Sequence, residues 1–246
     1  MNYIELITAF VAPWVVLELL LLFKRNDPIK TVLSGVLAVG AITIIISAPL
    51  NQILASQGIL EFNSSESLFM IGLVPFEIYG LIAGMCLFSG LILYFLRPRI
   101  HPVRIPSRWI KLGGVALLVP LAITCVIMLR ERALNHMGVI LLWFSIVMGS
   151  QWFFGGSLVW RTKSMFISAC LFSTGYFCLI DAFAIHKAYW GVNPFLSSGI
   201  SLFGLPIERV LYYLSINLCY CQGLELFWYL NRRKGLFTPR EQARTR

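Results

Sequence analysis

Two glutamates in the chain each follow a proline by two positions, at the start of a long apolar stretch. Residues 71–77 read IGLVPFE and residues 202–208 read LFGLPIE, so Glu77 and Glu208 occupy matched places. Proline suits the first turn of a helix, and glutamate suits the positive end of the helix dipole. One such motif alone favours a well-formed helix N-terminus. Two motifs in matched apolar surroundings favour functional acids.

A third acid and an asparagine lie upstream of these motifs at almost the same distance. Asn51 precedes Glu77 by 26 residues, and Asp181 precedes Glu208 by 27 residues. A carboxylic acid held neutral in an apolar site can act as a general acid. We therefore predict Glu77 and Glu208 as acids and Asp181 as an acid partner or proton relay, with a paired surface carboxylate as the alternative for Asp181. Asn51, which has no titratable proton, is predicted to end a helix and to orient one of the acids by a hydrogen bond.

Aromatic residues lie close in sequence to these acids. Trp190 and Tyr212 flank Glu208, and aromatic faces attract cations, so both are predicted to contact a cationic intermediate. The aromatic belt of a membrane protein would give a similar pattern. Arg209 directly follows Glu208; the adjacent cation favours a charged carboxylate, whereas apolar burial favours a neutral one, and the sequence leaves the balance open.

The composition indicates an integral membrane protein. The chain has 246 residues, of which 58% are hydrophobic and only 13% charged, whereas soluble domains carry about 25% charged residues. The formal charge of +9 could indicate a nucleic-acid partner, but the basic residues cluster in short connections, as membrane topology demands, so none is expected. The six cysteines lie in apolar runs without a C-x-x-C pair or a nearby histidine, so neither a metal nor a disulfide framework is expected.

Seven stretches are long and apolar enough to be predicted as transmembrane helices, since about 20 such residues cross a bilayer. They are 3–23, 31–50, 71–96, 112–129, 138–158, 164–185 and 205–230.

The distribution of basic residues predicts an orientation for these helices. Sixteen of the twenty lysines and arginines fall in alternate connections and in the C-terminal tail, on one side of the membrane. By the positive-inside rule the N-terminus then lies outside and the C-terminus in the cytoplasm. A bacterial inner membrane is the expected location.

The matched motifs predict an internal repeat. The fold expected is all-α, with two parallel three-helix repeats joined by a connector helix and related by an axis along the membrane normal. The predicted units are a first repeat at 1–98, a basic linker and connector helix at 99–130, a second repeat at 131–231 and a polar cytoplasmic tail at 232–246.

The second half of the chain resembles the lycopene cyclase domain of the heterodimeric and fused bacterial type. The resemblance rests on QWFFGG at 151–156, DAFA at 181–184, Trp190 and GLPIE at 204–208. It implies a cyclase of the intramolecular lyase or isomerase class that needs no cofactor and acts on a lipid-soluble isoprenoid among membrane lipids. It also assigns Gln151 and Trp152 to substrate binding.

The first half resembles the partner half of that family through VPFE at 74–77, but it departs at several places. The family has a second acid after Pro-x-Glu, where this chain has Ile78 and Arg209. The family usually has Asp and Trp where this chain has Asn51 and Leu60. The departures leave the fold prediction intact and open the question of the substrate.

The chemistry that the resemblance implies is ring closure of an isoprenoid end group. An acid protonates an alkene, the tertiary cation is attacked by a neighbouring double bond, and loss of a proton leaves a cyclic alkene. The alternative is a related membrane cyclase that acts on prenylated indoles or aromatics to make meroterpenoids. A small-solute transporter shares the three-plus-one-plus-three topology, but its proline-glutamine motif is missing here. The sequence leaves the oligomeric state open.

Overall fold

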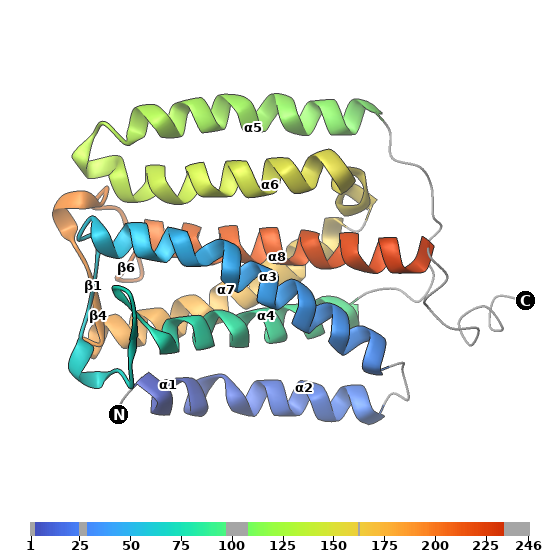
Figure 1. The fold of residues 1–246 in the computed structure, drawn as a ribbon, viewed down its shortest axis with the longest axis horizontal. Coiled ribbons are helices and arrows are strands. Elements are labelled where there is room, and N and C mark those ends of the chain that lie inside the picture. The colour runs from blue at the N-terminus through green and yellow to red at the C-terminus, as the bar shows by residue number, and fades with distance from the viewer. Residues whose placement is uncertain (1–2, 25–28, 97–107, 162, 234–246) are drawn as a thin grey trace, which may run out of the picture.

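The computed structural model describes residues 3–24, 29–96, 108–161 and 163–233 as a bundle of long helices lying side by side (Figure 1). The predicted basic linker as far as residue 107 and the predicted tail from residue 234 lie outside the described residues. In chain order the helices are α1 (Tyr3–Phe10), α2 (Ala12–Lys24), α3 (Ile29–Ser56), α4 (Phe76–Leu96), α5 (Arg108–Met128), α6 (Asn135–Arg161), α7 (Lys163–His186) and α8 (Ile207–Arg233).

Five helical segments among the described residues are long and apolar enough to cross a membrane. They are Tyr3–Lys24, Val32–Ser56, Phe76–Leu96, Arg132–Gly155 and Lys163–His186. This confirms the predicted class of helical membrane protein. The other two predicted spans correspond to a shorter apolar stretch in α5, Leu112–Met128, and to α8. The 27-residue α8 is more polar than the others because it carries Glu208, Arg209 and Glu225 along its length.

Several predicted boundaries are wrong by a turn or more. Helix α3 continues through Pro49 to Ser56, so Asn51 lies inside the helix and does not end it. The stretch before Phe76 is not helical, because Met70–Ile71 (β2) and Val74–Pro75 (β3) form an antiparallel hairpin. A second hairpin, Ser201–Leu202 (β5) with Leu205–Pro206 (β6), likewise precedes α8. Both Pro-x-Glu motifs therefore link a hairpin to the first turn of a helix.

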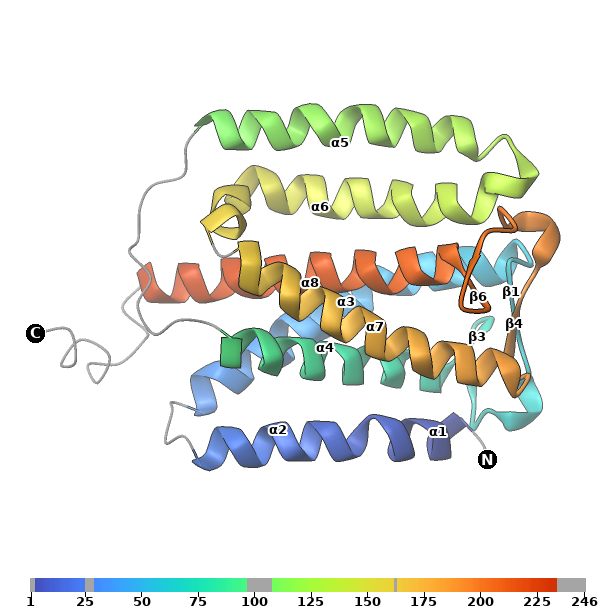
Figure 2. The ribbon, with the colours of Figure 1, turned by 180° about the vertical axis from the view of Figure 1, so that it is seen from behind.

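The connections before α4 and before α8 have the same order of elements. Strand β1 (Leu60–Phe62), the 3-10 helix η1 (Ser64–Glu66) and the β2–β3 hairpin lead to α4. Strand β4 (Trp190–Val192), the 3-10 helix η3 (Pro194–Leu196) and the β5–β6 hairpin lead to α8. The two connections meet because β1 and β4 pair antiparallel, at the end of the bundle where the N-terminus lies (Figure 2). These short strands were absent from the all-α prediction.

Matched residues in the two connections have matched conformations. Gly58 and Ala188, at equal distances after Asn51 and Asp181, both have positive φ, 66° and 56°, in the left-handed conformation that ends a helix. Asn63 and Asn193 each accept a backbone N–H bond two residues on, from Ser65 and Phe195, at the start of the 3-10 helices.

Polar and small side chains hold the centre of the bundle together. Asn217 of α8 accepts a hydrogen bond from Ser89 of α4 (2.6 Å) and donates one to Thr174 of α7 (3.0 Å), all three being buried.

Helix α4 approaches the N-terminal helices through Gly80 and Gly84, four residues apart. Small residues at this spacing allow membrane helices to pack closely. A Cβ at Gly84 would clash with Val11 Cγ1.

We predict that Gly84→Ala destabilises the bundle by about 1–3 kcal/mol, because the added methyl group overpacks the contact with Val11. Gly175→Ala is the matched control, since Gly175 lies on an exposed helical position with nothing within 4 Å of an added Cβ. Thermal unfolding of the purified protein in detergent measures both. Equal unfolding temperatures for the two variants would contradict the close approach of α4.

Candidate active site

Asp181 of α7 is the centre of a buried ion pair. Its side chain is fully buried, and Arg209 of α8 binds both carboxylate oxygens, Nε to Oδ2 at 2.7 Å and Nη2 to Oδ1 at 2.8 Å. This two-point geometry matches a planar guanidinium to a charged carboxylate. Arg209 therefore pairs with Asp181, and its neighbour in sequence, Glu208, is turned elsewhere.

Two aromatic side chains complete the hydrogen bonding of Asp181. Trp190 of β4 donates its indole N–H to Oδ1 at 2.7 Å, and the Tyr213 hydroxyl donates to the same oxygen at 3.1 Å. Both rings are buried. Trp190 is thus a ligand of the carboxylate rather than a free aromatic face. Arg209 also lies over the rings of Tyr212 and Tyr213, with centroid distances of 4.8 and 5.3 Å.

The ion pair is linked to the first half of the chain through Asn51. Tyr212 of α8 donates its hydroxyl to Asn51 Oδ1 at 2.8 Å, and Asn51 Nδ2 donates to the Ser47 carbonyl one turn earlier in α3. Asn51 therefore orients the Tyr212 hydroxyl, whereas the sequence predicted that it would orient one of the acids. We call Asn51, Asp181, Trp190, Arg209, Tyr212 and Tyr213 the Asp181 network.

Helix α1 covers the outer side of this network. The ring of Tyr3 stacks on Trp190 with centroids 5.7 Å apart, and the Tyr3 hydroxyl donates to the Tyr189 carbonyl at 2.6 Å. Tyr3 is 1% exposed, so this contact seals the network from solvent at the strand end of the bundle.

Glu77 and Glu208 both reach back from the first turn of a helix to the preceding connection, but they differ in the hydrogen bonding of one carboxyl oxygen, Oε2. Glu77 accepts the Leu68 N–H at Oε1 (2.6 Å) and the Ser67 hydroxyl at Oε2 (2.8 Å). Glu208 accepts the Ser198 N–H at Oε1 (2.6 Å), whereas its Oε2 is buried without a hydrogen-bond partner. Glu208 is 0% exposed. The Oε2 atom of Glu208 is therefore available to a group that enters the site.

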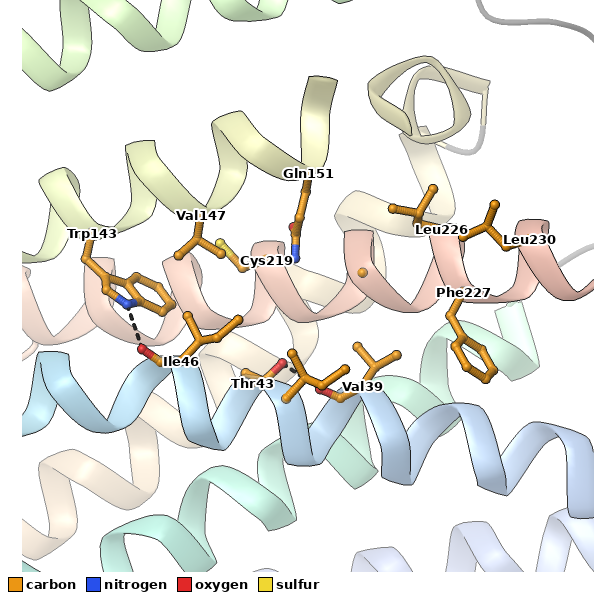
Figure 3. A pocket seen from close by; sticks show the side chains of 12 residues that line it. Val39, Thr43, Ile46, Trp143, Val147, Gln151, Cys219, Leu226, Phe227 and Leu230 are labelled. Atoms are coloured by element: carbon orange, nitrogen blue, oxygen red, sulfur yellow. Dashed lines mark hydrogen bonds between the residues drawn. The ribbon is translucent and has the colours of Figure 1, made fainter. Parts of the chain in front are cut away.

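The remaining predicted residues, Gln151 and Trp152, lie apart from the acids on α6. Gln151 lines a pocket between α3, α6 and α8 with a cavity volume of about 210 Å³ (Figure 3). The ring of Trp152 covers Gly114 of α5, where an added Cβ would clash with the indole ring, and Trp152 does not line this pocket. The structure therefore gathers Asn51, Asp181, Trp190 and Tyr212 but leaves Gln151 and Trp152 elsewhere.

Sequence reasoning missed one group near the acids, His136. His136 at the start of α6 is fully buried, with Nδ1 3.2 Å from the Ser197 hydroxyl and Nε2 unpartnered. Opposite charges within apolar helices could have suggested the Asp181–Arg209 pair. Among the described residues, no three His, Cys, Asp or Glu side chains come together as metal ligands.

Comparison with known proteins supports a lycopene cyclase family. The chain is 25% identical over 232 residues to the lycopene beta-cyclases of two strains of Halobacterium salinarum, covering 94% of this chain and 98% of the relative. Lycopene cyclases belong to the isomerase class of cyclases, which confirms the enzyme class expected from the sequence. No family model matches the chain. No solved structure matches it significantly.

We predict that Asp181→Asn and Arg209→Gln each destabilise the protein by about 3–5 kcal/mol, because each leaves the other charge buried without its partner. The double variant is expected to lose less than the sum of the two single losses. A double-mutant cycle from unfolding in detergent measures this coupling. Strictly additive losses would show that the two charges do not depend on each other.

Proposed function

We propose that this protein is a membrane-embedded isoprenoid cyclase that closes a ring on an end group of lycopene or a closely related carotenoid. The similarity to lycopene beta-cyclase over nearly the full length of both chains supports the substrate. The observation that carries the chemistry is the buried Glu208, whose Oε2 has no partner beside a fully satisfied Asp181 network.

Glu208 is the proton donor in this mechanism. Its neutral carboxyl gives the Oε2 proton to the end-group alkene, and the tertiary cation that forms is attacked by a neighbouring double bond to close a six-membered ring. The ring then loses a proton from an adjacent carbon to the Glu208 carboxylate, which restores the acid. Substrate and product have the same composition, and no oxidant or reductant is consumed. General acid catalysis of this kind contributes about 10²–10⁴-fold to a rate.

The Asp181 network positions Glu208 and excludes water from it. All the polar atoms of Asp181 are already bonded, so it holds α7, α8 and β4 together rather than donating a proton. The rings of Tyr212 and Tyr213 also belong to this network, because the Arg209 guanidinium lies over both of them. A dry site matters because water would trap the carbocation as an alcohol.

We further propose that the two halves are parallel repeats, residues 1–98 and 131–231, with α5 as part of the connector. The matched connections before α4 and α8 and their pairing through β1 and β4 support this division. The Glu77 half then shapes the site, and the Glu208 half carries the chemistry. The likeness to the heterodimeric and fused bacterial cyclases fits this arrangement.

Expression in a lycopene-accumulating host tests the proposed reaction. The wild-type protein is expected to convert lycopene to a product of shifted retention and unchanged mass. Glu208→Gln should reduce conversion at least 100-fold, because an amide cannot donate the proton. Glu77→Gln is the matched control, because Glu77 is hydrogen-bonded to the equivalent connection, the one before α4. This variant should keep more than a tenth of the activity.

Two results would overturn parts of this proposal. An unchanged lycopene pool with wild-type protein in the membrane would refute the substrate and favour a prenylated aromatic in its place. Full activity of Glu208→Gln would refute the assignment of the donor.

The positive-inside rule gives the proposed orientation, with the C-terminus in the cytoplasm. Reporter fusions test it: a fluorescent protein that folds only in the cytoplasm should be bright when fused after residue 246 and dark when fused within the η2 connection, Arg132–Leu134. The reverse pattern would invert the topology.

A further inference from the structure

The pocket between α3, α6 and α8 is open to the lipid phase and lies apart from the acids. Residues on its rim are exposed, Ile42 by 53%, Ile46 by 38% and Leu230 by 47%. Trp143 bridges α6 to α3 near one end of the pocket by donating its indole N–H to the Ile46 carbonyl at 3.0 Å (Figure 3). We call this pocket the lateral groove.

The shape and lining of the lateral groove suit a linear hydrocarbon. Its cavity volume of about 210 Å³ is below the ~300–1,000 Å³ of pockets for compact ligands. Along α8 its lining runs from Cys219 to Leu230, which spans about 16 Å at the rise of an α-helix. A long, mostly apolar groove of small volume accepts a segment of extended chain more readily than a ring system.

Gly223 of α8 keeps the lateral groove open. A Cβ at this position would lie 3.1 Å from Val39 and 3.3 Å from Gln151 Nε2, so any side chain would crowd both. Gln151 thus extends from α6 toward α8 (Figure 3), its amide nitrogen lies close to Gly223, and its Oε1 is buried without a partner.

The lateral groove leads toward the Asp181 network along two helix faces. On α8, Cys219 lies two turns after Tyr212, on the same face, and Glu208 lies a further turn before Tyr212. On α3, Thr43, Ser47 and Asn51 follow one another at a spacing of four residues. Ile46, at the end of the groove near Trp143, is about 7 Å along the helix from Asn51.

We propose that the lateral groove binds the long unreacted chain of a linear isoprenoid, which enters sideways from the membrane with its end group directed toward Glu208. The inference rests on the proposed cyclase function and specifies its substrate as a long chain rather than a short prenyl group. It implies that one end group is processed at a time while the remaining chain lies between α3 and α6.

Val147→Phe, which fills the lateral groove from α6, tests this inference. Its matched control is Ile146→Phe, the same change one residue earlier at a position that is 63% exposed. Lycopene conversion should fall at least tenfold with Val147→Phe and stay within twofold of wild type with Ile146→Phe. A geranyl-sized analogue with the same end group should be converted alike by both variants. Equal lycopene conversion by the two variants would overturn the groove while leaving the cyclase function intact.

Photolabelling of the wild-type protein tests the groove without relying on a variant or on turnover. A geranylgeranyl chain carrying a diazirine should label peptides of α3 and α6 that contain Val39–Ile46 and Trp143–Gln151. Lycopene should compete with the label and added phospholipid should not. Labelling spread over α2 and α5, or competition by phospholipid alone, would overturn the inference. Groove labelling by a protein that forms no cyclic product would support the groove and refute the cyclase.

Discussion

Burying the charges of Asp181 and Arg209 in an apolar bundle costs several kcal/mol per ion unless every remaining lone pair and N–H finds a partner. The surrounding elements meet that requirement from distant parts of the sequence. Trp190 comes from the strand after α7, Tyr213 from the next turn of α8, and Tyr3 from the first helix seals the outside. The pairing of β1 with β4 fixes Trp190 in register, because Phe62 lies opposite it. The strand end of the bundle is organised around this ion pair, and Glu208 is held beside it.

The two halves of the chain also differ in how completely their buried polar atoms are paired or hydrogen-bonded. The first half has Asn51 and Ile78 where the second has Asp181 and Arg209, so no charge pair forms there. Glu77 is hydrogen-bonded at both oxygens, whereas Glu208 is bonded at only one. One local fold therefore yields a structural cap in the first connection and a candidate proton donor in the second. The difference comes from Ser67, whose hydroxyl bonds Glu77; the matched Ser197, which likewise follows its 3-10 helix, has its hydroxyl 3.2 Å from His136 Nδ1 instead.

The sequence alone predicted the helices and the matched motifs because apolar length and proline placement are local signals. It also placed Asn51, Asp181, Trp190 and Tyr212 among the site residues, and the structure brings these four together. It could not predict the β1–β4 pairing, since two strands of three residues far apart in the chain have no local signature. The pairing of Arg209 with Asp181 rather than with its neighbour Glu208 depends on where α7 and α8 cross. The positions of Gln151 and Trp152 depend on which face of α6 meets α8 or α5.

Proton transfer from Glu208 to the substrate is tested most directly by cyclisation of lycopene in deuterated buffer, followed by mass analysis of the product. We expect the carboxyl proton to exchange with solvent after product leaves and before the next substrate closes the site, so each ring closed by the wild-type protein should carry one solvent deuterium, and Glu208→Gln should give no labelled ring. Cyclic product without solvent deuterium, or labelled product from Glu208→Gln, would contradict a protonation from this carboxyl group.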